Sequence, residues 1–394
     1  MNATDVVIVA AARTPQGRLK GQLAPFTAPQ LGALAIRGAL EQGSIDPQAV
    51  DAVLVGQVLP AGSGQNPARQ AAIGAGLGWD VTAGSVNKVC LSGLTAIIDA
   101  ARTIKAGDAE VMVAAGMESM TRAPHLLMGS RDGYTYGSIE VLDHMAYDGL
   151  TDAFDRESMG TSTERLNPRY HVTRDEQDAV AARSHQRAAA AAEAGVFDAE
   201  LVRVEVPQRK GDPIVLTRDE GVRPETTIET LAGLRPAFAK DGTITAGNSS
   251  QISDGASAAV LTTRERAEAE GWNILATVGA SGQTAGPDNS LHEQPSDSIS
   301  LALKKQGIEV ADLDFVEINE AFGAVVVASQ RALGLSDDIV NIHGGGIALG
   351  HPIGASGNRL VVHAVHELAR RGSGTAVVAL CGGGGQGDAL VLTR

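Results

Sequence analysis

The chain has few cysteines, few aromatic residues and a deficit of positive charge. Its 394 residues include 2 cysteines, which lie far apart and outside any CxxC pair. That usage excludes a disulfide framework and favours a reducing compartment. Aromatic residues make up 3%, so the core must be built from Ala, Val, Leu and Ile. The formal net charge of −14 argues against nucleic acid binding, because phosphate neutralisation needs clustered Lys and Arg.

Long hydrophobic runs are also missing. No window approaches the roughly 18 apolar residues of a membrane span. The opening Met-Asn-Ala-Thr-Asp lacks the basic and apolar regions of a secretory signal. We therefore expect a cytoplasmic protein with neither nucleic acid nor membrane among its partners. A chain of this length can hold two or more core units.

Apolar runs and helical periodicity alternate along the first third of the chain. Strands are expected at Asp5–Ala12, Ala52–Val58 and Glu110–Ala115, and helices at Ala28–Gly43 and Ser92–Lys105. This alternation predicts an α/β layered fold. Glycine is abundant, with 47 residues, and it clusters in the loops between these elements.

The pattern changes between Met117 and about Ala246. Charge density rises there, Pro and Gly are scattered, and the helix expected at Arg174–Ala194 is polar. We expect this segment to be an inserted loop domain that covers the core. Strand patterns return near Ser257–Thr262 and Ile274–Gly282.

A weak internal repeat links two distant parts of the chain. Each unit has a Ser-Gly pair, an amphipathic helix, a glycine and an apolar strand, beginning at Ser92 and at Ser356. Cys90 precedes the first unit and His351 precedes the second. The repeat predicts two homologous halves, each of which presents the loop before its helix to a shared cleft.

Cys90 has two interpretations that the local sequence does not separate. A free cysteine is most often a small buried hydrophobe. At a helix N-terminus, however, the macrodipole and free N–H groups would lower the pKa of the thiol and make it a nucleophile. The same N–H groups would hold an oxyanion.

His351 and Asn319 are also candidates. His351 lies between Gly350 and Pro352, where backbone can approach a ligand closely, and a neutral imidazole there would remove the Cys90 proton. A lone histidine is nonetheless usually structural. Local sequence favours Asn319 as a helix N-cap, and the alternative is that it orients a water or a carbonyl oxygen.

Cys381 opens a glycine run, Cys-Gly-Gly-Gly-Gly-Gln-Gly, after an apolar strand. Such a run can be a packing turn and nothing more. A second thiol near the first would instead act as acid and base, with its pKa tuned toward neutrality. The phosphate-loop pattern GxxxxGK[ST] is absent, so a nucleotide-driven reaction has no support. Two thiols and an imidazole on glycine-rich loops favour covalent acyl chemistry over metal binding.

Six motifs together resemble those of the thiolase family over essentially the whole chain. They are NKVCLSG around Cys90, GMESM at Gly116–Met120, TAGNSSQISDGA at Thr245–Ala256, NEAF at Asn319–Phe322, GHPIGASG at Gly350–Gly357 and CGGGGQG at Cys381–Gly387. The stretches APHLL and DHMAYDGLTDAF, the latter at Asp143–Phe154, are similar to the short-chain, acetoacetyl-CoA type.

The resemblance implies a five-layered αβαβα fold of two duplicated halves. The implied N-terminal half is 1–118 with 247–271, the inserted CoA-binding loop domain is 119–246, and the C-terminal half is 272–394. It also implies a homotetramer, or at least a homodimer. The implied activity is that of an acetyl-CoA C-acetyltransferase, the reversible condensation of two acetyl-CoA to acetoacetyl-CoA and CoA.

The resemblance also implies roles for the candidate residues. Cys90 would carry the acyl group as a thioester, His351 would activate it, and Cys381 would shuttle protons to and from the substrate α-carbon and the leaving thiol. Asn319 would hold a water that completes one oxyanion hole with His351. The backbone N–H groups of Cys90 and Gly383 would form the other.

The remaining implied contacts are with substrate. Ser250 would contact the pantetheine, Arg223 and Phe238 would lie near the nucleotide end of CoA, and Met159 and Phe322 would line the substrate pocket. Thioester exchange conserves one high-energy bond, so no metal and no cofactor are expected.

Three departures from the family pattern stand near this site. Gly382 replaces a more usual apolar residue, and we expect this replacement to change only the flexibility of the loop. Ser249 and Gln251 change the usual GNASG to GNSSQ, and Ser158 stands where histidine is common. The last two departures border the expected acyl and pantetheine pocket and bear on chain-length preference.

Three alternative functions remain open from sequence. The nearest is a degradative 3-ketoacyl-CoA thiolase of broader chain length that serves fatty acid β-oxidation. A decarboxylating ketosynthase has a related fold but generally pairs its cysteine with two histidines, or with histidine and asparagine, so the CGGGGQG thiol favours a thiolase. A non-enzymatic lipid carrier or scaffold is disfavoured by the presence of Cys90, His351 and Cys381. Direction, regulation and the choice between tetramer and dimer are not recorded in the sequence.

Overall fold

The computed structural model describes residues 2–208 and 210–394. Within that part of the chain, one ten-stranded sheet has the order β12-β13-β14-β11-β1-β10-β5-β3-β4, and β2 pairs with β10 beside this path. The strands are β1 (Val6–Arg13), β2 (Gly17–Arg18), β3 (Ala52–Gly56), β4 (Thr82–Val86), β5 (Val111–Ser119), β10 (Ser253–Thr263), β11 (Ala276–Ala285), β12 (Phe315–Ile318), β13 (Thr375–Gly382) and β14 (Gln386–Thr393).

Helices cover this sheet on both faces, and two small sheets lie outside it. The helices are α1 (Ala28–Gly43), α2 (Pro67–Ala75), α3 (Ser92–Ala106), α4 (Met159–Leu166), α5 (Arg174–Glu193), α6 (Ile228–Ala232), α7 (Arg264–Glu270), α8 (Gln294–Gln306), α9 (Gly323–Leu333), α10 (Gly346–Leu349) and α11 (Ser356–Arg371). The small sheets pair β6 (His125–Leu126) with β7 (Leu142–Asp143), and β8 (Val204–Val206) with β9 (Ile214–Leu216).

The large sheet contains the same strand arrangement twice. In the N-terminal half, β3 is parallel to β5, β5 is antiparallel to β10, and β10 is antiparallel to β1. In the C-terminal half, β12, β13, β14 and β11 repeat these three pairings in the same order. The halves meet at a short pairing of β1 with β11, in which Val7 lies opposite Thr277 and Ile8 opposite Ala276. The duplication predicted from the two Ser-Gly units is present in the topology.

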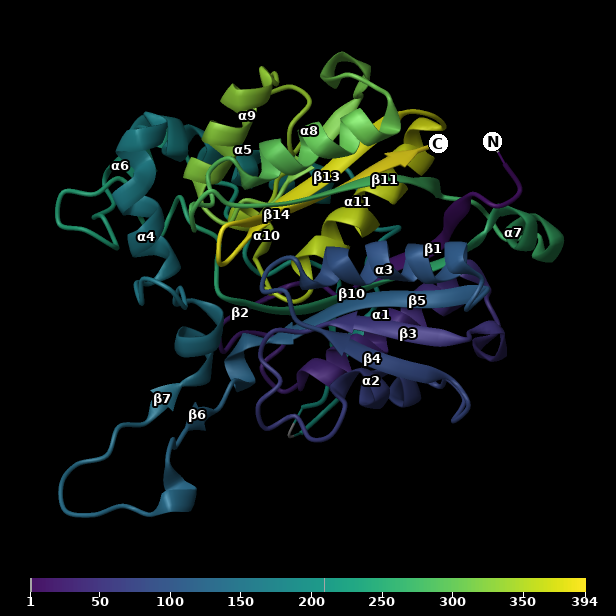
Figure 1. Cartoon of the computed structure of the whole chain (residues 1–394), viewed down its shortest axis with the longest axis horizontal. Coiled ribbons are helices and arrows are strands. Elements are labelled where there is room, and N and C mark those ends of the chain that lie inside the picture. Colours follow the sequence, from purple (N-terminus) through teal and green to yellow (C-terminus); the bar gives the residue numbers. More distant parts are fainter. Residues whose placement is uncertain (1, 209) are drawn as a thin grey trace.

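Side-chain alternation along the strands separates the core into layers. Phe315 of β12 packs with α3 and α11 in a central cluster, whereas Val316, the next residue, faces an outer cluster. Helices α1 and α2 cover the outer face of the N-terminal half, and α8 and α9 cover that of the C-terminal half. Figure 1 shows α3 and α11 between the blue and the yellow strands. The order is αβαβα, which confirms the expected five-layered fold.

The Ser-Gly pair of each repeat has a packing reason. A Cβ atom at Gly93 would lie 2.8 Å from the backbone nitrogen of Asn358, and one at Gly357 would lie 2.6 Å from the backbone nitrogen of Leu94. Only glycine permits the first turns of α3 and α11 to approach so closely. The loops that precede the two helices are therefore brought side by side.

The segment between β5 and β10 is built differently from the halves. β5 continues to Ser119, beyond its expected end at Ala115, because its last residues pair with β10 as far as Asp254. From there the chain forms α4 to α6 and the two small sheets. Figure 1 shows β6 and β7 leading into an arm that projects from the body. Its exposed apolar side chains are Leu127, Met128, Tyr134, Tyr136, Ile139 and Val141.

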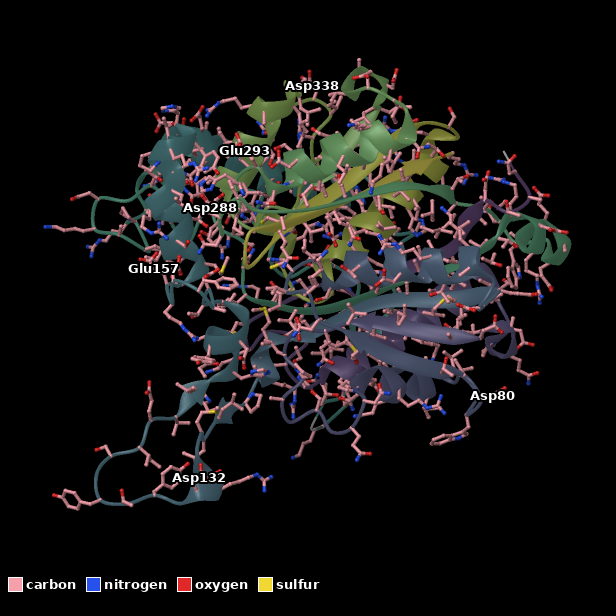
Figure 2. The ribbon with its side chains drawn as sticks, in the orientation of Figure 1. Asp80, Asp132, Glu157, Asp288, Glu293 and Asp338 are labelled. Atoms are coloured by element: carbon pink, nitrogen blue, oxygen red, sulfur yellow. The ribbon has the colours of Figure 1, made fainter. Side chains whose placement is uncertain are left out.

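The negative charge is spread over the outside of the molecule. Figure 2 labels acidic side chains at widely separated points: Asp80, Asp132, Glu157, Asp288, Glu293 and Asp338. Among the described residues, no helix combines the length and the apolar character that crossing a membrane requires.

Candidate active site

The candidate nucleophile, Cys90, lies in the turn between β4 and α3. The preceding residue, Val89, has φ of 50°, a left-handed conformation that is unfavourable for a β-branched side chain. Ser92 closes the turn: its Oγ donates to the carbonyl of Val89 at 2.6 Å and accepts from the N–H of Lys88 at 2.8 Å. The turn leaves Cys90 half-buried and in the lining of the cavity described below.

The expected lowering of the Cys90 pKa is wrong. Burial raises the pKa of Cys90 to about 12, against the opposing effect of the N–H groups of Cys90 and Gly383, and the nearby Glu118 raises it further. The helix begins at Ser92 after Leu91 as N-cap, so the thiol lies outside the first turn, where the macrodipole acts most strongly. The resting group is a thiol, so it could act as a nucleophile only with a base to remove its proton.

His351 is held in one orientation by its neighbours. Its backbone N–H donates to the carbonyl of Gln251 at 3.2 Å. Its ring Nδ1 lies 2.6 Å from Ser356 Oγ. That hydroxyl donates its own hydrogen to the carbonyl of Pro352 at 2.9 Å, so it accepts from Nδ1–H. This network assigns the tautomer and leaves the lone pair on Nε2.

The electrostatics of His351 keep the imidazole uncharged. Burial lowers the pKa of His351 to about 3, with a further contribution from the positive charge of Arg359. The imidazole is therefore neutral at pH 7 and can accept a proton at Nε2.

Asn319 is not a helix N-cap, which overturns the interpretation favoured by local sequence. Strand β12 ends at Ile318, and α9 begins only at Gly323, with Phe322 as its N-cap. Asn319 Nδ2 lies 3.4 Å from His351 Nε2. Its buried Oδ1 has no hydrogen-bond partner among residues 2–208 and 210–394. An unpaired buried oxygen beside the imidazole is suited to hold a water or a polar substrate group.

Cys381 lies near the end of β13, opposite Gly387 of β14, and is buried. Burial raises the pKa of Cys381, and the nearby Cys90 raises it further. The expected tuning toward neutrality is therefore wrong for the resting protein. A Cβ at Gly382 would lie 2.6 Å from Leu91 Cγ, so this glycine permits close packing against the Cys90 turn rather than loop flexibility alone.

The two thiols and the imidazole share one small cavity. Its volume is about 60 Å³, and its lining includes Cys90, His351, Cys381 and Gly383. We call it the inner cavity. The expected N–H donor of Gly383 acts on the Cys90 sulfur here, since it lowers the pKa of that thiol.

A larger cavity of about 600 Å³, the outer cavity, adjoins the inner one, since the two share lining residues. Met159, Ser250 and Phe322 line both, and Arg223 and Phe238 line the outer one. The structure therefore brings every candidate substrate residue onto one continuous wall. Among the described residues, no cluster of three or more His, Cys, Asp or Glu has the arrangement of a metal site.

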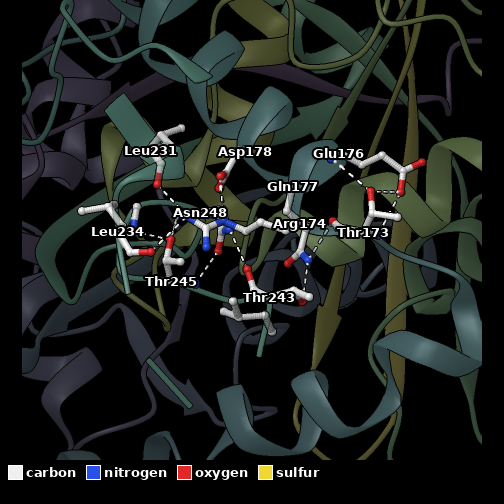
Figure 3. A network of polar contacts seen from close by, with 12 residues as sticks. Thr173, Arg174, Glu176, Gln177, Asp178, Leu231, Leu234, Thr243, Thr245 and Asn248 are labelled. Atoms are coloured by element: carbon white, nitrogen blue, oxygen red, sulfur yellow. Dashed lines mark hydrogen bonds and ion pairs between the residues drawn. The ribbon is translucent and has the colours of Figure 1, made fainter. Parts of the chain in front are cut away.

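Residues from the segment between β5 and β10 build the wall of the outer cavity. Phe238 meets Phe322 edge to face, with ring centroids 6.2 Å apart. Ser250 follows Asn248, whose amide donates to Asp178 of α5 at 2.8 Å and accepts from Thr245 N–H. Figure 3 shows this network of polar contacts around α5. These hydrogen bonds hold the segment that carries Ser250 against α5.

The departures at Ser158, Ser249 and Gln251 have local roles. Ser158 is the N-cap of α4, and Ser249 Oγ donates to the carbonyl of Thr245 at 2.7 Å. Gln251 Nε2 donates to the carbonyls of Gly221 and Ile347, at 3.1 and 3.0 Å. Gln251 thus ties the inserted segment to the loop of His351.

Glu118 was missed by the sequence interpretation. This fully buried residue of β5 accepts from the N–H groups of Val58, Leu59 and Gly354, at 2.9, 3.2 and 3.0 Å. Burial raises its pKa to about 7, opposed by these three donors. The sequence signal that could have identified Glu118 is a carboxyl group within the otherwise apolar run of β5. Ser356, the partner of His351, was noticed only as part of the repeat.

Comparisons with known proteins agree with this architecture. Residues 6–265 match the family model "Thiolase, N-terminal domain", and residues 272–394 match "Thiolase, C-terminal domain". The chain belongs to the thiolase family.

Individual relatives are similar over nearly the full length. A "Probable acetyl-CoA acetyltransferase" of Mycobacterium tuberculosis is 58% identical over 389 residues, covering 99% of each chain. An "Acetyl-CoA acetyltransferase" of Pseudomonas aeruginosa is 50% identical over 391 residues, again covering 99% of each. The crystal structure of the Bacillus anthracis acetyl-CoA acetyltransferase superposes with a TM-score of 0.96 at 38% identity, covering 99% of this chain and 98% of that one.

Proposed function

We propose that this thiolase is an acetyl-CoA C-acetyltransferase, which condenses two acetyl-CoA to acetoacetyl-CoA and CoA and runs the reverse thiolysis. The observation that carries the proposal is the inner cavity, which is lined by two thiols, a neutral imidazole and Gly383 and lies beside the wider outer cavity. Relatives 47–58% identical over nearly the full chain that bear this name support it. The reaction uses CoA thioesters as substrates and calls for no metal or other cofactor.

In the first half-reaction, Cys90 becomes acetylated. His351 Nε2 takes the thiol proton as Sγ attacks the carbonyl carbon of acetyl-CoA. The developing oxyanion is held by the N–H groups of Cys90 and Gly383, each worth roughly 3 kcal/mol of barrier. The CoA sulfur leaves with a proton from Cys381, a neutral thiol in the resting enzyme.

In the second half-reaction, the Cys381 thiolate removes a methyl proton from a second acetyl-CoA. The enolate oxygen accepts hydrogen bonds from protonated His351 and from a water held on Asn319 Oδ1. The enolate carbon attacks the acetyl-Cys90 carbonyl to form a tetrahedral intermediate. The intermediate collapses as its bond to the Cys90 sulfur breaks, and that sulfur takes back the proton from His351. The product is acetoacetyl-CoA.

The outer cavity is proposed to bind CoA. Arg223 supplies positive charge for phosphate groups, Ser250 a polar contact for pantetheine, and Met159, Phe238 and Phe322 an apolar wall. We propose that residues 119–246 form the CoA-binding insert between an N-terminal half of 1–118 with 247–271 and a C-terminal half of 272–394.

A broad-range 3-ketoacyl-CoA thiolase is the second candidate. The inner cavity has about a tenth of the volume of the outer one, which favours a short acyl group at Cys90. Thiolysis rates with 3-ketoacyl-CoA substrates of increasing length test the choice. A sharp preference for acetoacetyl-CoA supports the acetyltransferase, similar rates for long substrates support the alternative, and no thiolysis of any substrate contradicts both.

We also infer a cytoplasmic homotetramer. The exposed apolar side chains of the arm between β6 and β7 support self-association, because such surface is unfavourable in water. The two free thiols support a reducing compartment. Light scattering on the full-length protein and on a variant with a shortened arm tests the assembly: four copies falling to two is expected, and a wild-type monomer contradicts it.

A further inference from the structure

A partly buried ion pair, with its carboxylate fully buried and its lysine 23% exposed, joins the Cys90 turn to the β13–β14 hairpin that carries Cys381. Lys88 Nζ lies 2.7 Å from Asp388 Oδ1, and the Asp388 side chain is fully buried. Thr95 Oγ1 of α3 donates to Oδ2 at 2.9 Å, and Gln283 Nε2 of β11 lies 3.3 Å from Oδ1. Asp388 thus gathers donors from both halves of the molecule.

The two residues of the ion pair lie close in sequence or in the strand ladder to the two cysteines. Lys88 precedes Cys90 by two residues. Asp388 lies opposite Leu380 in the β13–β14 ladder, one step from the pairing of Gly387 with Cys381. Neither charged residue lines the inner cavity, so the pair acts on the thiols through the backbone rather than by touching substrate.

Stability alone is a weak reason for such a pair. Burial raises the pKa of Asp388, and the contacts with Lys88, Thr95 and Gln283 only oppose that effect. Apolar replacement of a buried ion pair is often neutral or stabilising, whereas a pair of this kind can select one arrangement of the elements it joins. Here the elements joined are the two backbone segments that carry the thiols.

The N-terminal half has a corresponding contact. Ser257 lies opposite Gly116 in the β5–β10 ladder, the position that Asp388 occupies opposite Leu380 in the other half. Its Oγ donates to the carbonyl of Ala355, in the loop between His351 and α11, at 3.1 Å. Asp388 in the C-terminal half therefore contacts the loop before α3, and Ser257 at the equivalent position in the N-terminal half contacts the loop before α11.

We propose that Lys88 and Asp388 are positioning residues that set the separation of the Cys90 and Cys381 sulfur atoms. The inference rests on the proposed function, because in the condensation step Cys381 must remove a proton from a methyl group that is held against the acetyl group on Cys90. Acetylation of Cys90 needs Cys381 only to protonate the departing CoA sulfur, a proton that water can also supply, whereas condensation needs the Cys381 thiolate at the substrate methyl group. Acetylation should therefore tolerate a changed separation better than condensation does.

The test compares the two half-reactions in K88M and D388N. First-turnover release of CoA measures acetylation, and steady-state acetoacetyl-CoA formation measures condensation. We expect condensation to fall about 10- to 100-fold, as for small misplacements of reacting groups, and acetylation to stay within about threefold of wild type. The matched control is K305M, which removes an exposed lysine that bonds the carbonyl of Ser281 on β11.

A second readout reports the thiol separation directly. Phenylarsine oxide bridges two thiols only at a suitable distance, and intact mass measures the bridged fraction. We expect slower bridging in K88M and D388N, wild-type bridging in K305M, and recovery in K88R, which keeps the charge. If either single variant fails to fold, K88M/D388L replaces the pair by apolar groups, and the same losses are expected.

Two results would overturn the proposal. One is wild-type condensation and bridging in the variants, and the other is an equal fall of both half-reactions, which indicates general structural damage. Failure of the wild type to acetylate Cys90 would instead contradict the proposed function, and the bridging rates would still test whether the pair positions the thiols.

Discussion

The two halves share a topology but present different chemistry at equivalent places. In the N-terminal half, Cys90 lies two residues before α3 in a turn strained at Val89. In the C-terminal half, His351 lies five residues before α11 and is fixed through Ser356. The duplicated scaffold therefore determines where the loops meet, and the loop conformation determines which group each loop supplies.

Support across the halves is reciprocal. Glu118, near the end of β5, holds the N–H of Gly354 in the His351 loop. Gly383, just after β13, directs its own N–H at the Cys90 sulfur. Because each half stabilises the loop of the other, neither reactive group is organised by its own half alone. The following predictions separate the contributions, beginning with the largest effect.

Removing the sulfur of the N-terminal half should have the greatest effect. In C90S the hydroxyl is a far weaker acid and a poorer nucleophile than the thiol, so its proton transfer to neutral His351 and its attack are both less favourable. We expect no acetyl-enzyme and a fall in turnover of about 10⁴-fold or more. Intact mass after incubation with acetyl-CoA measures the adduct. An acetylated C90S protein would remove Cys90 from the mechanism.

Removing the sulfur of the C-terminal half should affect the later step most, because water can replace Cys381 as the donor of a proton to the departing CoA sulfur. C381S is expected to acetylate Cys90 but to lose condensation by about 10²- to 10⁴-fold, the range of acid–base catalysis. Deuterium uptake into the methyl group of acetyl-CoA measures the proton abstraction directly. If C381S exchanges and condenses normally, the proton is moved by another group.

Freeing the imidazole of the C-terminal half should have an intermediate effect. S356A deletes the acceptor of His351 Nδ1–H, so the ring can adopt the other tautomer. We expect kcat to fall about 10- to 100-fold with little change in KM. The matched control is S300A, a serine of α8 that bonds only the carbonyl of Ser296. An unchanged kcat in S356A would show that the hydroxyl does not orient the base.

The smallest effect concerns the support that β5 gives to the His351 loop. Burial raises the Glu118 pKa from 4.5 to about 7. Between these values the native state keeps a proton that the unfolded chain has lost, so this group's contribution to stability falls as pH rises toward 7 and is lost above it. From pH 5 to pH 8, the free energy of unfolding by urea should drop about 2 kcal/mol more in wild type than in E118Q. Equal drops would contradict the shifted pKa.

Much of the scaffold could be predicted from the sequence. Helix α1 begins and ends where its periodicity predicts, at Ala28 and Gly43, because its apolar face and caps are local signals. The loops of Cys90 and His351 could be paired because the Ser-Gly units repeat. The reason why these two loops meet is the close approach of α3 and α11 at Gly93 and Gly357. That contact is visible only in the structure.

The errors came from properties that depend on distant partners. The pKa of Cys90 is raised because packing around the turn buries it, which no helix-terminus argument anticipates. The N-cap signal at Asn319 was overridden because the helix begins later, at Gly323. Lys88 and Asp388 are 300 residues apart, so a single sequence gives no sign that they meet.

The central claim is that Cys90 alone carries the acyl group while Cys381 handles protons. Peptide mass mapping of wild-type protein, quenched in acid after a brief exposure to acetyl-CoA, tests it most directly. The account predicts an acetyl group on the peptide that contains Cys90 and an unmodified peptide around Cys381. Acetyl on Cys381, or on neither cysteine while turnover proceeds, would contradict it.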